Sequence, residues 1–126
     1  MNGGEDVEED LIEVGEYIER FNELTGQEIP CGPIYQSHGL AIHVKNHHPG
    51  EESVLDHIEE VIEQPDYVGK HPKEENSVEL VKQIDGNIMV CIKLDVRNGY
   101  LFVASMFKIS NGKLNNRIHS GRLKPY

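Results

Sequence analysis

Two turn-forming dipeptides, Asp85-Gly86 and Asn98-Gly99, divide much of the second half of the chain into three apolar segments. The segments are "SVELVKQI" (77–84), "NIMVCIKLDV" (87–96) and "YLFVASMFKI" (100–109), and they are rich in β-branched, aromatic and other apolar residues. Asp-Gly and Asn-Gly between such segments are the strongest short-range indication of a β-hairpin, because these residues adopt positive φ at little cost. The sequence therefore predicts a three-stranded antiparallel meander.

Two helices are expected in the first half of the chain. Apolar residues recur at spacings of three and four within residues 5–25, and acidic residues fill most positions between them. This pattern is typical of an amphipathic helix, and Gly26 is a suitable stop. A second apolar stripe runs through residues 52–64 and ends before Pro65, because the residue that precedes a proline avoids the helical conformation. The first helix packs either on its own domain or on a partner.

Between these helices the pattern changes. Residues 26–39 carry three glycines and two prolines, which indicates a loop or a short hairpin. Residues 40–48, "LAIHVKNHH", then alternate apolar and polar positions, which predicts a half-buried strand with His43 pointing away from the apolar face. Residues 66–70, "DYVGK", fit a short edge strand.

Together these elements predict an α+β fold in which two helices from the N-terminal half pack on an antiparallel sheet of about four strands. A length of 126 residues suits a single domain over residues 1–126, with residues 1–25 as an acidic helical N-terminal extension.

The formal net charge of −10 is unevenly distributed along the chain. Residues 1–64 hold 16 acids against two cations, whereas residues 65–126 hold six acids against ten cations. This balance argues against a broad basic surface that binds nucleic acid non-specifically. A local cationic cleft remains compatible with it, because screening limits each charge to about 8–10 Å at physiological salt.

The expected location is cytoplasmic. No apolar run approaches the ~18 residues of a membrane span, and the acidic start "MNGGEDVEED" lacks the apolar core of a secretory signal. Cys31 and Cys91 show no metal-ligand spacing, and a disulfide between them is not expected in the cytosol. No metal or other cofactor is expected.

Three histidines, His43, His47 and His48, lie within six residues. On a strand, the 43/47 spacing does not present two ligands to one metal ion as it would on a helix. Two imidazoles that titrate near neutrality could act as acid and base, or they could belong to a solvated loop. Strand alternation places Cys91, Lys93 and Asp95 on one face, and it places Ser105 with Leu101, Val103 and Phe107. A lysine and a serine on central strands either line a polar site on the sheet or simply belong to its solvent-exposed face.

The stretches "SHGLAIHVKNHH", "QPDYVGKHPK", "NSVELVK", "VCIKLD", "YLFVASMF" and "RIHSGRLK" follow one another between about residues 37 and 124. In order and spacing, this region resembles the phage-associated branch of the barnase–EndoU–colicin–RelE nuclease superfamily. The resemblance implies a helix-plus-antiparallel-sheet fold and metal-independent RNA cleavage by a phage, prophage or toxin-type protein. In such chemistry a base takes the 2′-hydroxyl proton, an acid protonates the leaving oxygen, and cations stabilise the phosphorane.

The resemblance also suggests roles for individual residues. His43 and His47 would be base and acid in either order, and Lys70 and Arg122 would clamp phosphate. Ser105 and Ser120 would donate hydrogen bonds to phosphate oxygens. We expect the tail 119–126 to border this anion site, and its removal to abolish activity without affecting the fold.

Two features that differ from the family pattern favour an alternative function. The net charge is unusual for a protein that approaches RNA, and the third strand carries Ser105 and Phe107 where the family pattern has Thr and Tyr. An inactive relative that binds RNA or protein, such as a phage-encoded inhibitor, is the competing hypothesis. A basic protein partner could bind through helix 5–25, and the same helix could make the protein a dimer rather than a monomer.

Overall fold

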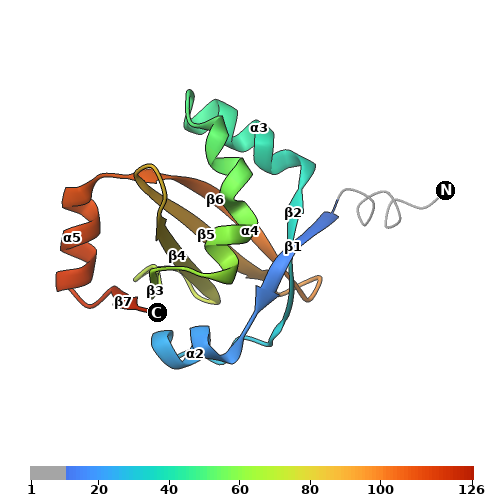
Figure 1. Ribbon diagram of the computed structural model, residues 1–126. Helices are drawn as coiled ribbons and strands as arrows, with labels where there is room; N and C mark the ends of the chain where they lie inside the picture. The colour runs from blue at the N-terminus through green and yellow to red at the C-terminus, as the bar shows by residue number, and fades with distance from the viewer. Residues whose placement is uncertain (1–10) are drawn as a thin grey trace.

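The computed structural model describes residues 11–126 and shows a mixed seven-stranded sheet with helices on both faces (Figure 1). The strand order is β1-β2-β6-β5-β4-β3-β7, and every neighbouring pair is antiparallel except β2 and β6. The strands are β1 (Leu11–Tyr17), β2 (Gly32–Ser37), β3 (Tyr67–Gly69), β4 (Ser77–Gln83), β5 (Asn87–Asp95), β6 (Tyr100–Ile109) and β7 (Leu123–Pro125). The helices are α2 (Glu19–Thr25), α3 (His38–His47), the 3₁₀ helix η1 (Glu52–His57), α4 (Ile58–Glu63) and α5 (Asn111–His119).

The predicted meander is confirmed as β4, β5 and β6. Asp85 and Gly86 both have positive φ, at 47° and 104°, and Gly99 has a φ of 77° in the second hairpin. The turn chemistry that marks the hairpins in the sequence is therefore used in the structure. The α+β class is also correct, but the sheet has seven strands rather than about four.

The helix predicted over residues 5–25 is wrong over residues 11–17 and confirmed over residues 19–25; residues 5–10 lie outside the described part. Residues 11–17 form strand β1, and only residues 19–25 are helical. The register of β1 against β2 shifts between Glu13 and Gly15, which marks a bulge at Val14. Because a bulge inserts one residue, Val14 and Tyr17 both face the core although they are three apart. A bulged strand thus imitates the apolar spacing of a helix.

The strand predicted over residues 40–48 is also wrong, since this segment is helix α3. Leu40 and Val44 are buried one helical turn apart, whereas Ile42 between them is 62% exposed. Leu40, Ile42 and Val44 occupy alternate positions, as in a half-buried strand. However, only Leu40 and Val44, which are four positions apart, are buried in the core. As a consequence, His43 and His47 lie on one face of a helix.

The remaining short elements differ from expectation in part. The expected loop or hairpin at 26–39 contains strand β2, which pairs in parallel with β6. Strand β3 forms within 66–70 but lies between β4 and β7 rather than at an edge. The helix expected at 52–64 forms as η1 followed by α4 and ends before Pro65. Helix α5 was not expected.

A bulge in β6 changes which of its residues share a face. Cys91 pairs with Ser105, but the next residue, Ile92, pairs with Val103, so Ala104 is the extra residue. Ser105 therefore lies on the face of Cys91 and Lys93, opposite the core residue Val103. The predicted alternation, which placed Ser105 with Leu101 and Val103, fails because it assumes an unbroken period of two.

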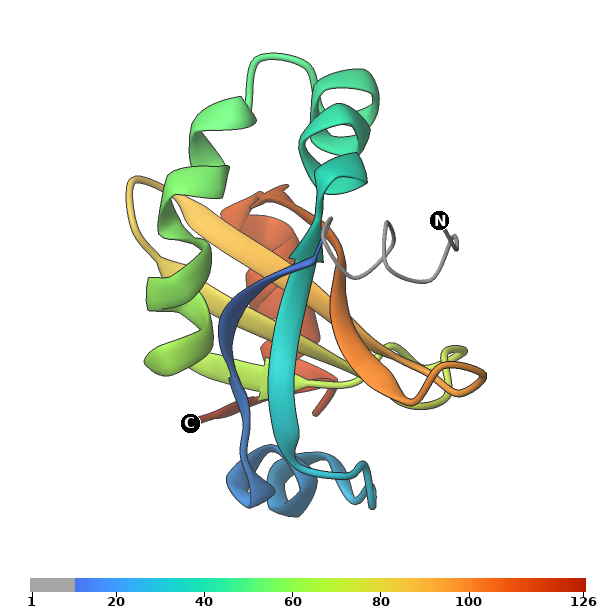
Figure 2. The same cartoon turned by 90° about the vertical axis from the view of Figure 1, so that its right-hand side faces the viewer.

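Two apolar clusters stabilise the sheet from its two faces. The larger cluster packs α2, α3, η1 and α4 against β1, β2 and the central strands, with Phe21, Val61 and Ile62 among its buried members. The smaller cluster packs Leu114 of α5 on Val81, Met89 and Leu123. Helices α4 and α5 accordingly lie on opposite sides of β4 and β5 (Figures 1 and 2). None of the helices in residues 11–126 has the length and apolar character needed to cross a membrane.

The C-terminal tail is part of the fold. Strand β7 pairs with β3, and Leu123 is 1% exposed. We therefore expect deletion of residues 119–126 to destabilise the fold, contrary to the expectation from sequence.

Gly69 provides a test of the contact between β3 and the tail. A β-carbon at this position would overlap the carbonyl oxygen of Arg122, and backbone cannot move aside as a side-chain tip can. Gly69→Ala is expected to lower the free energy of unfolding by about 1–3 kcal/mol, measured by urea denaturation. Gly39→Ala is the control, because its β-carbon would lie 3.5 Å from the Ser37 hydroxyl in an ordinary contact. Equal stability of the two variants would contradict this account.

Candidate functional site

A pocket of about 260 Å³ opens on the sheet face that α5 partly covers. We call it the His43 pocket. Its lining residues come from α3, from the β3–β4 connection and from the three meander strands: His43, His71, Glu74, Ser77, Val78, Glu79, Cys91, Lys93, Ala104 and Ser105. The pocket thus brings two imidazoles, two carboxylates, an ammonium and hydroxyl groups to one place.

His43 reaches this pocket from α3. While Leu40 and Val44 anchor the helix in the larger core, the His43 ring points toward β6, and its Nε2 lies 3.1 Å from the Ser105 Oγ. The hydroxyl donates this hydrogen bond when Nε2 carries no proton, and it accepts when Nε2 is protonated. The β6 bulge makes the contact possible, because it turns Ser105 away from the core.

Two further imidazoles surround His43. The ring centroid of His47 lies 4.5 Å from that of His43, and His48 lies 6.2 Å away and stacks on Phe107 at 4.6 Å. Desolvation, followed by the neighbouring His47 and His48, lowers the pKa of His43 below its ordinary value of 6.5. The His43 imidazole is therefore mainly neutral at pH 7 and can accept a proton.

The charged groups of the pocket are paired. The Lys93 ammonium lies 3.3 Å from a Glu74 carboxylate oxygen at the surface. Arg122 donates two hydrogen bonds to Glu79, of 2.8 Å from Nε and 2.6 Å from Nη2. This bidentate pair is largely buried, because the side chains of Arg122 and Glu79 are 19% and 5% exposed. Arg122 thereby fixes the orientation of one pocket carboxylate.

Cys91 lies between Glu79 and Ser105 in the sheet register. Burial, and to a smaller extent the charge of Glu79, raise the pKa of its thiol to about 12. The thiol is therefore neutral at physiological pH and contributes little as a nucleophile. Cys31 and Cys91 are both free, so no disulfide joins them.

The residues selected from sequence do not all meet in this pocket. His43 and Ser105 are in contact there, His47 is beside them, and Arg122 reaches the pocket through Glu79. Lys70 lines a different hollow, and its ammonium donates to the backbone oxygen of His71 at 3.4 Å.

Ser120 is exposed on the tail. Its hydroxyl donates to the Arg117 backbone oxygen at 3.1 Å and accepts from the Arg122 amide at 3.3 Å. Ser120 thus shapes the turn that leads to Arg122.

Sequence analysis missed Glu79, Glu74 and His71 as pocket residues. Glu79 could have been found, because it is a carboxylate in the middle of the apolar segment "SVELV", where a charge requires a partner. Its partner, Arg122, could not be found in this way, since the two are 43 positions apart. Within the described residues, no group of three or more His, Cys, Asp or Glu side chains is placed to hold a metal ion.

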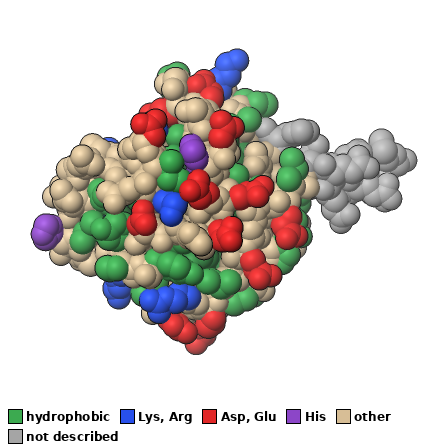
Figure 3. Space-filling model, viewed as in Figure 1, with side chains coloured by type: hydrophobic (Ala, Val, Ile, Leu, Met, Phe, Trp, Pro, Cys, Tyr) green, Lys and Arg blue, Asp and Glu red, His purple; other side chains and the backbone are tan. Residues whose placement is uncertain are grey.

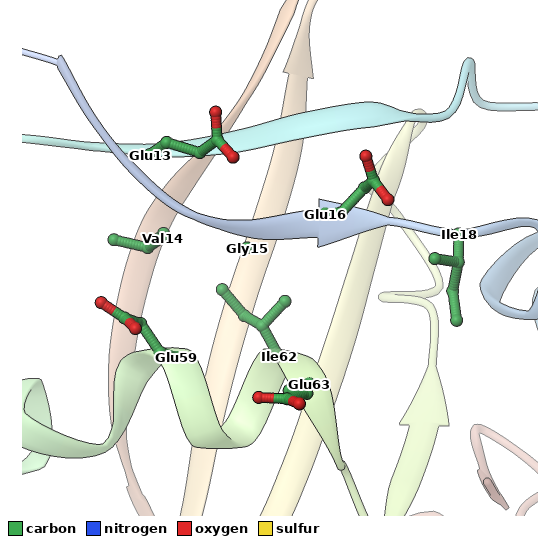
Figure 4. Close-up of a pocket in the computed structure, with 8 residues that line it drawn as sticks. All are labelled: Glu13, Val14, Gly15, Glu16, Ile18, Glu59, Ile62 and Glu63. Atoms are coloured by element: carbon green, nitrogen blue, oxygen red, sulfur yellow. The ribbon is translucent and has the colours of Figure 1, made fainter.

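Another hollow, of about 490 Å³, lies between β1 and α4 (Figure 4). Ile62 of α4 points toward Gly15 of β1 in this hollow, and Glu13, Glu16, Glu59 and Glu63 border it. We call it the acidic groove. Acidic side chains are also spread widely over the face seen in Figure 3. This groove would repel a phosphate backbone, so it is a poor site for nucleic acid although it is larger than the His43 pocket.

Residues 12–116 match the family model described as phage-Barnase-EndoU-ColicinE5/D-RelE like nuclease3. The chain belongs to this nuclease-like family. The match confirms the resemblance inferred from sequence, and it extends further toward the N-terminus, so that it includes β1 and α2. No curated protein and no solved structure matches the chain significantly. The match ends within α5 and leaves out the tail that carries Ser120 and Arg122.

Membership of a nuclease-like family makes nucleic acid the expected substrate. The His43 pocket and the acidic groove differ in their suitability for it. Of these two hollows in residues 11–126, only the His43 pocket combines proton-transfer groups with a lysine and a largely buried arginine nearby, so we take it as the candidate active site of this family member.

Proposed function

We propose that the protein is a metal-independent endoribonuclease that cleaves RNA by transesterification in the His43 pocket. The hydrogen bond between His43 and Ser105 carries this proposal, because it holds a mainly neutral imidazole at the wall of a pocket that also contains Lys93. Family membership supports a nuclease, and the phage-type family supports a prophage or toxin-type role in the cytoplasm.

In this proposal His43 is the general base. Its lowered pKa leaves the imidazole neutral. When Nε2–H donates to the Ser105 Oγ, the unprotonated Nδ1 can take the proton from a 2′-hydroxyl, and the 2′-oxygen then attacks the adjacent phosphorus. His47, the neighbouring imidazole on the same helix face, is the acid that protonates the leaving 5′-oxygen. This transfer cleaves the RNA and leaves a 2′,3′-cyclic phosphate on one fragment and a free 5′-hydroxyl on the other.

The other polar groups stabilise charge. Ser105 orients His43 and can donate to a phosphate oxygen, while the Lys93 ammonium offsets the negative charge of the phosphorane. Arg122 acts through Glu79 by fixing the orientation of this carboxylate. We assign Lys70 to phosphates of the RNA that extend outside the pocket, because it lines a separate hollow.

RNA cleavage in the presence of EDTA tests this function directly. The purified protein is expected to cut single-stranded RNA and to leave 2′,3′-cyclic phosphate and 5′-hydroxyl ends. Because the base must be neutral and the acid His47 must be protonated, the rate is expected to follow a bell-shaped pH profile whose rising limb has an apparent pKa below 6.5. Intact RNA, cleavage that requires a divalent metal, or a rate that does not rise with pH on the acidic side would contradict the proposal.

The acidic groove supports a second candidate, a binding module without catalysis. Four glutamates at its border complement a basic segment of a partner protein, and β1 beside it is an edge strand of the sheet. This candidate replaces the earlier idea of a partner at helix 5–25, since residues 11–17 form a strand. Absence of RNA cleavage, together with salt-sensitive binding of a lysine-rich peptide that Glu59→Gln and Glu63→Gln weaken, would favour it.

A further inference from the structure

Three aromatic side chains form a continuous cluster on the neighbouring strands β2 and β6. The ring centroids of Tyr35 and Tyr100 are 6.1 Å apart and nearly perpendicular, and Tyr100 and Phe102 are also 6.1 Å apart. All three side chains are half-buried, so part of each ring reaches solvent. We call this cluster the aromatic platform.

The strand register places the platform beside the His43 pocket. Phe102 pairs with Tyr35 on one side and with Lys93, a pocket residue, on the other. The preceding residues on the two strands, Ile34 and Leu101, are 0% and 4% exposed in the larger core. The aromatic rings therefore lie on the opposite face, which they share with Lys93. Since neighbouring strands are about 4.8 Å apart, Tyr35 lies roughly 10 Å from Lys93 along this face.

The surroundings leave the platform accessible. Helix α5 covers the end of this sheet face that carries Met89 and Val81, and the platform lies toward the other end. The nearest pocket cation, Lys93, lies on the side of the platform where the phosphate would bind. Of the glutamates that border the acidic groove, Glu59 and Glu63 project from α4, which packs on the other face of the sheet, whereas Glu13 of β1 pairs with Tyr35.

We propose that Tyr35, Tyr100 and Phe102 form a stacking site for bases that flank the scissile phosphate of single-stranded RNA. This inference rests on the proposed function, because it takes the His43 pocket as the place of cleavage. Aromatic side chains on an open sheet face bind unstacked bases of single strands through their π-faces, with little dependence on base identity. The platform thus selects single-stranded over double-stranded RNA, whose bases are occupied with one another.

Binding is measured without cleavage, so that the two proposals can fail separately. The probe is a fluorescein-labelled 2′-O-methyl RNA of about 12 nucleotides, which lacks the nucleophilic 2′-hydroxyl. Its affinity for the full chain is measured by fluorescence anisotropy at fixed salt. Tyr35→Leu and Tyr100→Leu are each expected to weaken binding by about 5- to 150-fold, while Tyr35→Phe stays within about twofold because the ring remains.

Tyr126→Leu is the matched control. Tyr126 is 39% exposed and follows β7, at the opposite edge of the sheet from β2, so its loss should leave RNA affinity unchanged. Urea unfolding of each variant separates stacking on RNA from cross-strand packing, because packing alone would change stability and not affinity. Unchanged affinity of both Tyr35→Leu and Tyr100→Leu would overturn the platform, whether or not the protein cleaves RNA.

A measurement on the unmodified chain covers the case in which the leucine variants fail to fold. A 4-thiouridine-containing version of the same RNA is cross-linked to the protein and the labelled peptides are mapped. Cross-links in the peptides that contain Tyr35 or Tyr100 support the platform. Cross-links confined to other peptides overturn it.

Discussion

His43→Ala is expected to lower the rate of RNA cleavage by about 10²- to 10⁴-fold. The reason is that His43 supplies the neutral imidazole in contact with Ser105 at the pocket wall, and removal of a general base loses its whole contribution to the transition state. The rate is measured on a fluorogenic single-stranded RNA in EDTA at pH 7. The remaining activity should also lose its pH-dependent rise below 6.5.

His119→Ala is the control for this loss. His119 is exposed on α5, and its Nδ1 contacts the Asn115 backbone oxygen at 3.0 Å, outside the His43 pocket. Its removal should leave the rate within about twofold, as for surface substitutions away from a site. If His43→Ala retains full activity, or if both variants lose activity equally, His43 is not the base.

Arg122→Ala is expected to lower the free energy of unfolding by about 3 kcal/mol. The substitution leaves the Glu79 carboxylate, which is 5% exposed, without its bidentate partner. The cost arises mainly from this uncompensated buried charge rather than from the lost attraction. Urea denaturation at pH 7 gives the change, and the smaller α5 cluster around Leu123 should be affected first, because Leu123 follows Arg122 directly.

Two variants make this result specific. Lys124→Ala removes an exposed cation two residues after Arg122, in β7, and should change stability by no more than about 0.5 kcal/mol. The double variant Arg122→Met with Glu79→Leu removes both charges, and it should recover most of the stability because apolar residues tolerate the buried position. A single Arg122→Ala variant as stable as Lys124→Ala would show that the pair contributes little.

Variants of the Arg122–Glu79 pair also test how Arg122 contributes to RNA cleavage. If Arg122 acts only by fixing Glu79, activity should fall with Arg122→Ala and also with Glu79→Gln, which keeps the shape of the side chain. A loss in the arginine variant alone would instead assign Arg122 a direct contact with phosphate, as the family resemblance suggests. The two variants thus distinguish a positioning residue from a substrate-binding residue.

The predictions of helix and strand failed where the spacing of apolar residues was compatible with both conformations. In residues 40–48, alternate apolar positions predicted a strand, but burial of Leu40 and Val44 four apart is compatible with a helix and decides the conformation. In residues 11–17, the bulge at Val14 gave a strand the spacing of a helix. The error over residues 40–48 affected the predicted site, since helix α3 brings His43 and His47 to one face.

The sequence by itself determined what depends on neighbouring residues. Turn chemistry at Asp85-Gly86 and Asn98-Gly99 specified the meander, and the order of motifs specified the nuclease-like family. Only the tertiary structure decided the contacts between distant segments. The bulge at Ala104 turns Ser105 toward His43, and the tail places Arg122 on Glu79. Such pairings leave no local pattern, because their stability comes from burial and hydrogen bonds between residues that are separated by 62 and 43 positions.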